Sequence, residues 1–133
     1  MITLYLCVDD NLGLLFNHRR QSRDIRVLED MTGGLSSPLT IDPFSEKLLS
    51  GAGLPYQLAG EALAEDAHYF VEDRCPCDLL PRAGALVLYR WNRHYPADTY
   101  FTPDLSAEGF SLKETVEFPG KSHEIITKEV YTR

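Results

Sequence analysis

The chain has few of the residues that mark several common classes of protein. Its 133 residues include three cysteines, two methionines and one tryptophan. An odd and small number of cysteines is not the pattern of a disulfide-stabilised scaffold, and Cys75 and Cys77 are too close together to suggest one. We therefore expect a protein of the reducing cytoplasm.

Long hydrophobic runs and positive charge are also scarce. No apolar run approaches the roughly 20 residues of a membrane-spanning helix. There are 13 lysines and arginines against 20 aspartates and glutamates, and this balance disfavours broad binding to nucleic acid or to an anionic membrane. The first apolar stretch meets Asp9 and Asp10 with no basic residue before it, so we expect no signal peptide. We therefore expect no nucleic-acid or membrane partner, and a small-molecule ligand stays open.

Familiar catalytic and metal-binding motifs are missing as well. The nine glycines form no dinucleotide-binding or phosphate-binding fingerprint. None of the four histidines has a serine or cysteine partner at a motif spacing. Cys75 and Cys77 enclose one residue, whereas redox pairs usually enclose two, and no second pair completes a zinc site. We expect no metal, and we interpret Cys7 as an inert buried residue.

Hydrophobic patterning instead indicates one α/β domain over residues 1–133, with a mixed sheet. A helix is expected over residues 22–31, capped by Ser22 with Asp24 in its first turn, and a second helix is expected to begin at Asp42 with Pro43 in its first position. The pattern of residues 51–67 is ambiguous, with a short Ala/Glu-rich helix over residues 58–67 as one interpretation, and residues 12–16 are expected to form a loop. Strands are expected over residues 2–8, 68–71, 85–91 and 99–101, and residues 112–118 and 124–131 alternate as an antiparallel hairpin.

Both ends of the chain carry segments that are similar to the dihydrofolate reductase family. Residues 4–9 match its first strand, and residues 24–28 match the start of its first helix. The run Leu79-Leu80-Pro81-Arg82-Ala83 before a strand, and the corner Ala97-Asp98-Thr99-Tyr100-Phe101, occur in the family's order. The resemblance implies a dihydrofolate-reductase-like mixed sheet flanked by helices, with an antiparallel C-terminal hairpin.

The resemblance also implies a substrate site. Asp24 stands where the family places the carboxylate that holds the pterin, a bidentate charge-assisted contact, and we predict it as the catalytic carboxylate. The predicted walls of that site are Cys7, Ile25, Leu28 and Tyr89. Two other interpretations stay open: Asp24 is a helix-start residue stabilised by the dipole, or it forms a structural ion pair with Arg20 or Arg23. Without such a cation, burial should raise its pKa.

A local cluster of arginines departs from the acidic balance of the chain. Arg19, Arg20 and Arg23 precede the first predicted helix, and we predict that they attract an anion. The alternative is a solvated surface. For Arg26, pairing with Glu29 and Asp30 one helical turn away is favoured.

The segments that match the family's cofactor site carry the wrong charge for a cofactor phosphate. The family presents a pair of glycines where this chain has Glu72 and Asp73, and a Gly-Arg helix start where it has Asp42-Pro43-Phe44-Ser45. We therefore disfavour NADPH and leave the cofactor unknown. The predicted function is a diverged small-molecule-binding or assembly domain without NADPH-dependent reductase activity. The alternative is a diverged reductase that acts on a pterin-like or other flat heterocycle with NAD(P)H.

Overall fold

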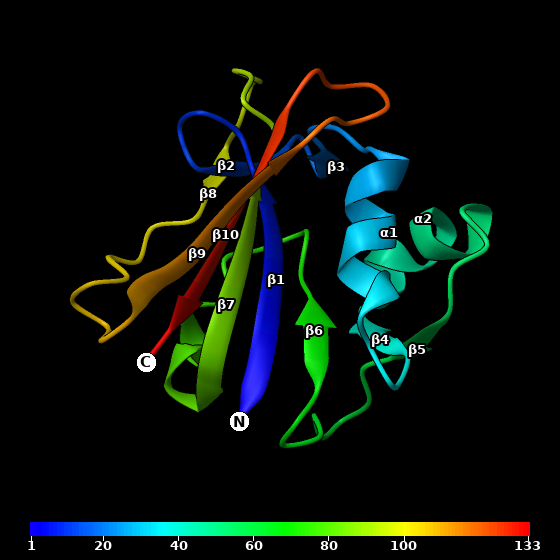
Figure 1. The fold of residues 1–133 in the computed structure, drawn as a ribbon. Helices are drawn as coiled ribbons and strands as arrows, with labels where there is room; N and C mark the ends of the chain where they lie inside the picture. Colours follow the sequence, from blue (N-terminus) through cyan, green and yellow to red (C-terminus); the bar gives the residue numbers. More distant parts are fainter.

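The first strand of the chain lies in the middle of a seven-stranded sheet. The computed structural model describes residues 1–133, and the sheet order is β5-β4-β6-β1-β7-β10-β9 (Figure 1). Strand β1 (Ile2–Val8) pairs in parallel with β6 (His68–Phe70) on one side and with β7 (Ala83–Arg90) on the other. Its apolar run is the pattern of a strand buried on both faces, so the predicted centre of the sheet is confirmed.

The two halves of the sheet differ in strand direction. Strands β4 (Leu39–Ile41) and β5 (Tyr56–Leu58) continue the parallel half beyond β6. Strand β10 (Ile126–Thr132) pairs antiparallel with β7 and with the edge strand β9 (Ser111–Phe118). The mixed sheet and the C-terminal hairpin predicted from alternation are both present.

Helices and a second small sheet surround this main sheet. The helical segments are α1 (Ile25–Gly33), η1 (Pro43–Ser45), α2 (Glu46–Gly51) and η2 (Cys77–Arg82). The small sheet has the order β3-β2-β8, formed by Arg19–Arg20, Gly13–Phe16 and Thr99–Tyr100. None of the helices is long and apolar enough to cross a lipid bilayer.

The alternation of side chains along β1 divides the core into two layers. Tyr5 points to the layer that holds Leu28 and Met31 of α1. Leu4, Leu6 and Val8 point to the opposite layer, which the small sheet and η2 cover. The central strand therefore supports α1 on one face and the β2 loop region on the other.

Three local expectations differ from the structure. Residues 12–16 were expected as a loop but contain β2, whose Leu14 and Leu15 are buried in the core. Residues 58–67 form no helix: Leu58 ends β5, which pairs with β4, and residues 59–67 have no regular secondary structure. The cap of α1 is Asp24 rather than Ser22: Asp24 has extended backbone, and its carboxylate accepts a hydrogen bond from the Arg26 N–H at 2.9 Å.

The cysteines also differ from expectation. Cys75 and Cys77 are joined by a disulfide across a sequence separation of two, whereas their closeness had suggested no disulfide framework. Cys7 is the free cysteine. The bond closes a very small loop and joins no separate elements of the fold.

One substitution made in two places tests this description of the core. Leu86 on β7 is fully buried, whereas Leu112 on β9 is 52% exposed. We expect Leu86→Ala to lower the free energy of unfolding by about 2–5 kcal/mol, because it leaves a cavity between packed layers. Leu112→Ala should change it by less than about 0.5 kcal/mol. Urea denaturation followed by circular dichroism measures both, and equal losses would contradict the assigned layers.

Candidate functional site

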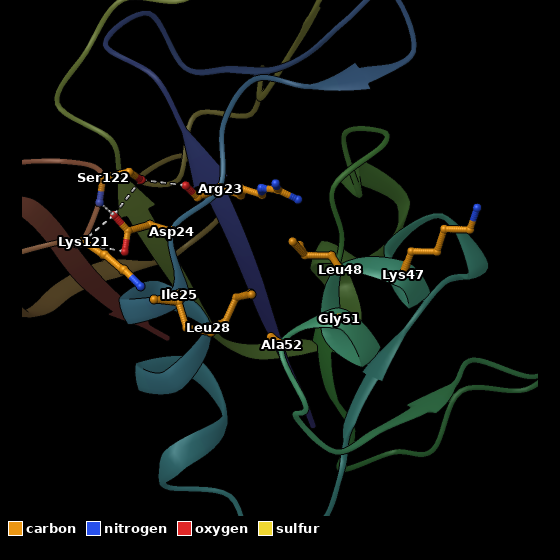
Figure 2. A pocket seen from close by; sticks show the side chains of 10 residues that line it. All are labelled: Arg23, Asp24, Ile25, Leu28, Lys47, Leu48, Gly51, Ala52, Lys121 and Ser122. Carbon is orange, nitrogen blue, oxygen red and sulfur yellow. Dashed lines mark hydrogen bonds between the residues drawn. The ribbon is translucent and has the colours of Figure 1, made fainter.

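A groove of about 640 Å³ lies between the start of α1 and helix α2 (Figure 2). Residues 23–28 form one wall, residues 47–52 form the opposite wall, and the turn that precedes β10 closes one end. The apolar part of the lining consists of Ile25, Leu28, Leu48 and Ala52. These side chains make an open surface that could hold the flat or apolar body of a ligand.

The polar rim of the groove is positive. Arg23, Lys47 and Lys121 line it, and none of them makes an ion pair within the chain. Asp24 is the one acidic residue in the lining. In a chain of net charge −7, this groove therefore collects unpaired cations, and it favours an anionic group.

The Asp24 carboxylate faces the turn rather than the open groove. Its oxygens accept hydrogen bonds from the backbone N–H groups of Lys121 at 2.9 and 3.0 Å and of Ser122 at 2.9 Å. The Ser122 hydroxyl at 3.2 Å and His123 Nδ1 at 3.0 Å complete the set, beside the N–H of Arg26. A carboxylate has about four lone-pair positions, so these donors leave none for a pterin.

These contacts also determine the charge of Asp24. Burial alone would raise its pKa, but the hydrogen bonds from the 121–123 turn and from the start of α1 outweigh burial and hold the pKa well below its usual range. The basic residue whose side chain contacts Asp24 is His123, not Arg20 or Arg23. The geometry favours a structural role for Asp24, and its ligand role stays a prediction.

His123 links Asp24 to a chain of hydroxyl groups. The imidazole is buried and stacks on Trp91 with ring centroids 4.7 Å apart. Because Nδ1 donates to the ionised carboxylate, Nε2 is the acceptor, and it lies 3.1 Å from Ser22 Oγ and 3.0 Å from the Tyr95 hydroxyl. The Tyr95 hydroxyl in turn lies 3.3 Å from Ser22 Oγ. The order hydroxyl, imidazole, carboxylate is that of groups that activate a serine.

The three predicted anion-binding arginines are not brought together. Arg23 lines the groove, and Arg19 lies exposed on β3. Arg20 instead donates to both carboxylate oxygens of Glu72, at 2.9 and 3.0 Å, and stacks over Phe44. A guanidinium held by a bidentate carboxylate is already neutralised, so the prediction of Arg20 as an anion ligand is not supported.

The predicted apolar walls separate in a similar way. Ile25 and Leu28 line the groove. Cys7 instead borders two small cavities that also contact Ser22, Glu72 and Trp91. Tyr89 lies outside the groove: its side chain is buried and its hydroxyl donates to Asp30 at 2.7 Å, so it ties β7 to α1.

The segments after β4 and β6 meet at one edge of the sheet, because the carboxyl ends of neighbouring parallel strands lie side by side. Ser45 donates to Glu72 at 2.6 Å, and Arg74 donates to Asp42 at 2.7 Å and to Asp73 at 3.3 Å. Asp42 also accepts from the Tyr69 hydroxyl at 2.5 Å. The acidic residues predicted here are thus present, and each is paired with an arginine.

Sequence reasoning missed several residues of this region. Lys47 and Lys121 in the groove carried no motif, and neither did the link between Ser22 and His123. Asp24 and His123 are 99 residues apart, and only the fold brings them together. These side chains are close because the turn before β10 packs against the start of α1. The spacing of residues along the sequence does not indicate this contact.

Comparison with solved structures identifies the fold. The chain is similar to dihydrofolate reductase from Enterococcus faecalis, solved in complex with NADP(H) and RAB-propyl, with a TM-score of 0.69 and 12% sequence identity. The match covers 100% of this chain and 96% of that one. No protein-family model matches the sequence, and no curated protein matches it. The dihydrofolate-reductase-like mixed sheet inferred from the sequence is therefore confirmed, as a fold.

Replacing Asp24 tests its structural role. A folded-state pKa below the unfolded value of about 3.9 means that the carboxylate stabilises the fold above that pH, and that this contribution fades as the pH falls below it. We expect Asp24→Asn to lower the free energy of unfolding by about 3 kcal/mol at pH 7 and to flatten its pH dependence between about pH 5 and 2. Denaturant titration across this range measures both.

The matched control is Asp10→Asn, which removes the same charge from an exposed position. It should change stability by less than about 0.5 kcal/mol. If Asp24→Asn is as stable as the Asp10 variant, the hydrogen bonds to the turn contribute little, and the ligand role of Asp24 gains support.

Proposed function

We propose that the groove between α1 and α2 binds a small anionic molecule with a flat or apolar body. The observation that carries this proposal is the set of three unpaired cations around an apolar floor. The cations recognise carboxylate or phosphate groups, and the aliphatic side chains bury the body of the ligand. The chain is then a diverged dihydrofolate-reductase-like domain that has kept a ligand groove.

We further propose that this domain does not carry out NADPH-dependent reduction. A cofactor pyrophosphate needs free N–H groups and unpaired cations, whereas the edge after β4 and β6 holds three carboxylates against two arginines that they already occupy. The residues present there do not fit the phosphate groups of NADPH. A flat heterocycle with its own negative charge fits the groove better than a dinucleotide fits this edge.

Binding of folate, which joins a pteridine to two carboxylates, tests the groove. We expect folate to raise the melting temperature and pterin, which lacks the carboxylates, to raise it less. Removing one cation by Lys47→Met or Lys121→Met should weaken folate binding up to about fivefold, and added salt should weaken it further. Calorimetric titration gives the dissociation constants.

Lys113→Met on the exposed strand β9 is the matched control and should leave folate binding unchanged. Equal losses in all three variants would show only the effect of net charge, and no binding at all would remove folate-like ligands from the proposal. Oxidation of NADPH in the presence of dihydrofolate should stay at background. Turnover above background would favour the alternative, a diverged reductase.

A second candidate function rests on a different observation, the chain of contacts from Ser22 through His123 to Asp24. In an acyl transfer, Ser22 Oγ would attack the carbonyl carbon while His123 Nε2 takes the serine proton and passes it to the leaving group. Water would then release the acid from the acyl-serine. The N–H groups of Ser22 and Arg23 have no partner within the chain and are free to bind the oxyanion.

A fluorophosphonate reagent, which labels activated serines, tests this candidate directly. We expect one label on Ser22 by peptide mass spectrometry, lost in Ser22→Ala and in His123→Gln. Ser106→Ala, an exposed serine in a loop, should keep full labelling. If the protein remains unlabelled after prolonged incubation, the hydroxyl, imidazole and carboxylate serve only to hold the turn.

A further inference from the structure

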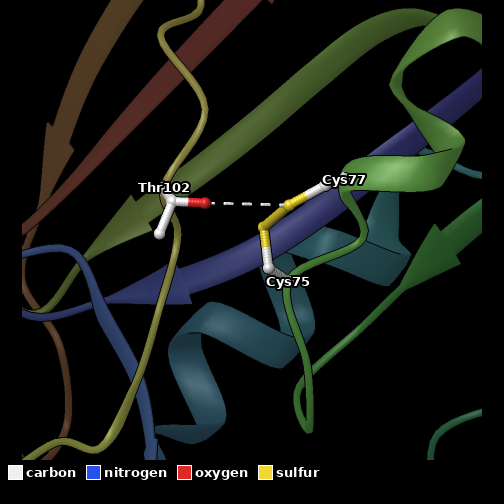
Figure 3. Close-up of a disulfide and its surroundings, with 3 residues drawn as sticks. All are labelled: Cys75, Cys77 and Thr102. Atoms are coloured by element: carbon white, nitrogen blue, oxygen red, sulfur yellow. Dashed lines mark hydrogen bonds between the residues drawn. A yellow bond between two sulfur atoms is a disulfide. The ribbon is translucent and has the colours of Figure 1, made fainter.

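The disulfide between Cys75 and Cys77 contributes little to the stability of the fold. Stabilisation by a cross-link grows with the length of the loop that it closes, and this loop contains Pro76 alone (Figure 3). The bond joins Cys75, two residues before η2, to Cys77, the first residue of that helix. A cross-link that constrains so little of the unfolded chain is poorly explained as a device for stability.

The surroundings hold both cysteines in place without the bond. Pro76 is buried, and its carbonyl accepts a hydrogen bond from the Leu79 N–H at 3.0 Å, which sets the start of η2. Leu80, in the same short helix, is buried in the core. Because these contacts do not involve sulfur, the segment can keep its backbone path when the disulfide opens.

The two sulfur-bearing residues differ in access. Cys77 is exposed, whereas Cys75 is half-buried against the core layer that contains Leu80. The Thr102 hydroxyl lies 3.9 Å from Cys77 Sγ, within hydrogen-bond range of the sulfur (Figure 3). Exposed disulfides are the ones that exchange with thiols, since an attacking thiolate can reach them.

We propose that Cys75 and Cys77 form a thiol–disulfide exchange site that takes electrons from an accessible dithiol. This proposal is independent of the groove and goes beyond the proposed function. A partner thiolate attacks Cys77 Sγ, the Cys75–Cys77 bond breaks, and Cys75 leaves as a thiolate that takes up a proton. The second thiolate of the partner then attacks the partner sulfur that is bonded to Cys77 and releases Cys77 as a thiolate, which takes up a proton. The partner loses two electrons and leaves oxidised, and the pair is reduced to two thiols.

Glutathione redox buffers test the exchange on the folded protein. After equilibration at a series of ratios of reduced to oxidised glutathione, thiols are trapped with a maleimide and counted by intact mass. We expect two tags to appear together within the accessible range of ratios, and the melting temperature to change by less than about 4 °C on reduction. The Cys75→Ser/Cys77→Ser double variant reports the background tagging of Cys7.

Single variants separate exchange from a passive bond. Cys75→Ser lacks the resolving sulfur, so it should accumulate a stable mixed disulfide between glutathione and Cys77. Cys77→Ser should accumulate much less, because Cys75 is less accessible. The wild type should also oxidise a dithiol peptide faster than the double variant does.

Three results would overturn the proposal. The disulfide could persist at every glutathione ratio until the chain unfolds, which would make it a structural bond. The pair could stay reduced even in oxidised glutathione, in which case no disulfide is available to exchange. The dithiol peptide could be oxidised equally fast by wild type and double variant, in which case the pair has no exchange activity.

Discussion

The buried carboxylate of Asp24 makes the hydrogen bonds on which the geometry of the candidate groove depends. It caps α1 and, through the same two oxygens, holds the backbone of the turn that leads into β10. The turn approaches so closely that a Cβ atom at Gly120 would lie 2.6 Å from Asp24 Oδ2. Because the groove has α1 on one side and this turn at its end, both its shape and the position of Lys121 follow from one ionised side chain.

The same contact explains why the charges of this chain are distributed as they are. A carboxylate that is satisfied by N–H groups needs no arginine, so Arg20 is free to pair with Glu72 and Arg23 is free to reach the groove. Because Asp24 needs neither arginine, one of them forms an ion pair near the ends of β4 and β6, and the other remains unpaired in the groove. It leaves a groove with a positive rim between two helices of an acidic protein.

The elements that could be predicted from the sequence are those whose burial pattern is local. The apolar run of β1 predicted a buried strand, and the alternation in β9 and β10 predicted an antiparallel hairpin. Both predictions were confirmed. Strands β4 and β5 have three residues each, too few for a period to show. The Ala/Glu-rich segment after β5 has helix propensity but forms no helix, and propensity alone is a weak guide to the structure of a short segment.

In the candidate site too, local features could be predicted from the sequence and tertiary contacts could not. The position of Asp24 at the start of the first helix could be inferred from the resemblance to a known family, because that position depends on the local order of strand, loop and helix. Its charge state could not, since the donors come from a turn about a hundred residues later, and they reverse the effect that burial alone would have on its pKa. A fold shared at 12% identity shows the arrangement of strands and helices, but it does not show the partners of any one side chain. The chemistry of this groove therefore depends on its own cations and on the hydroxyl and imidazole groups beside it, whose neighbours only the folded chain supplies.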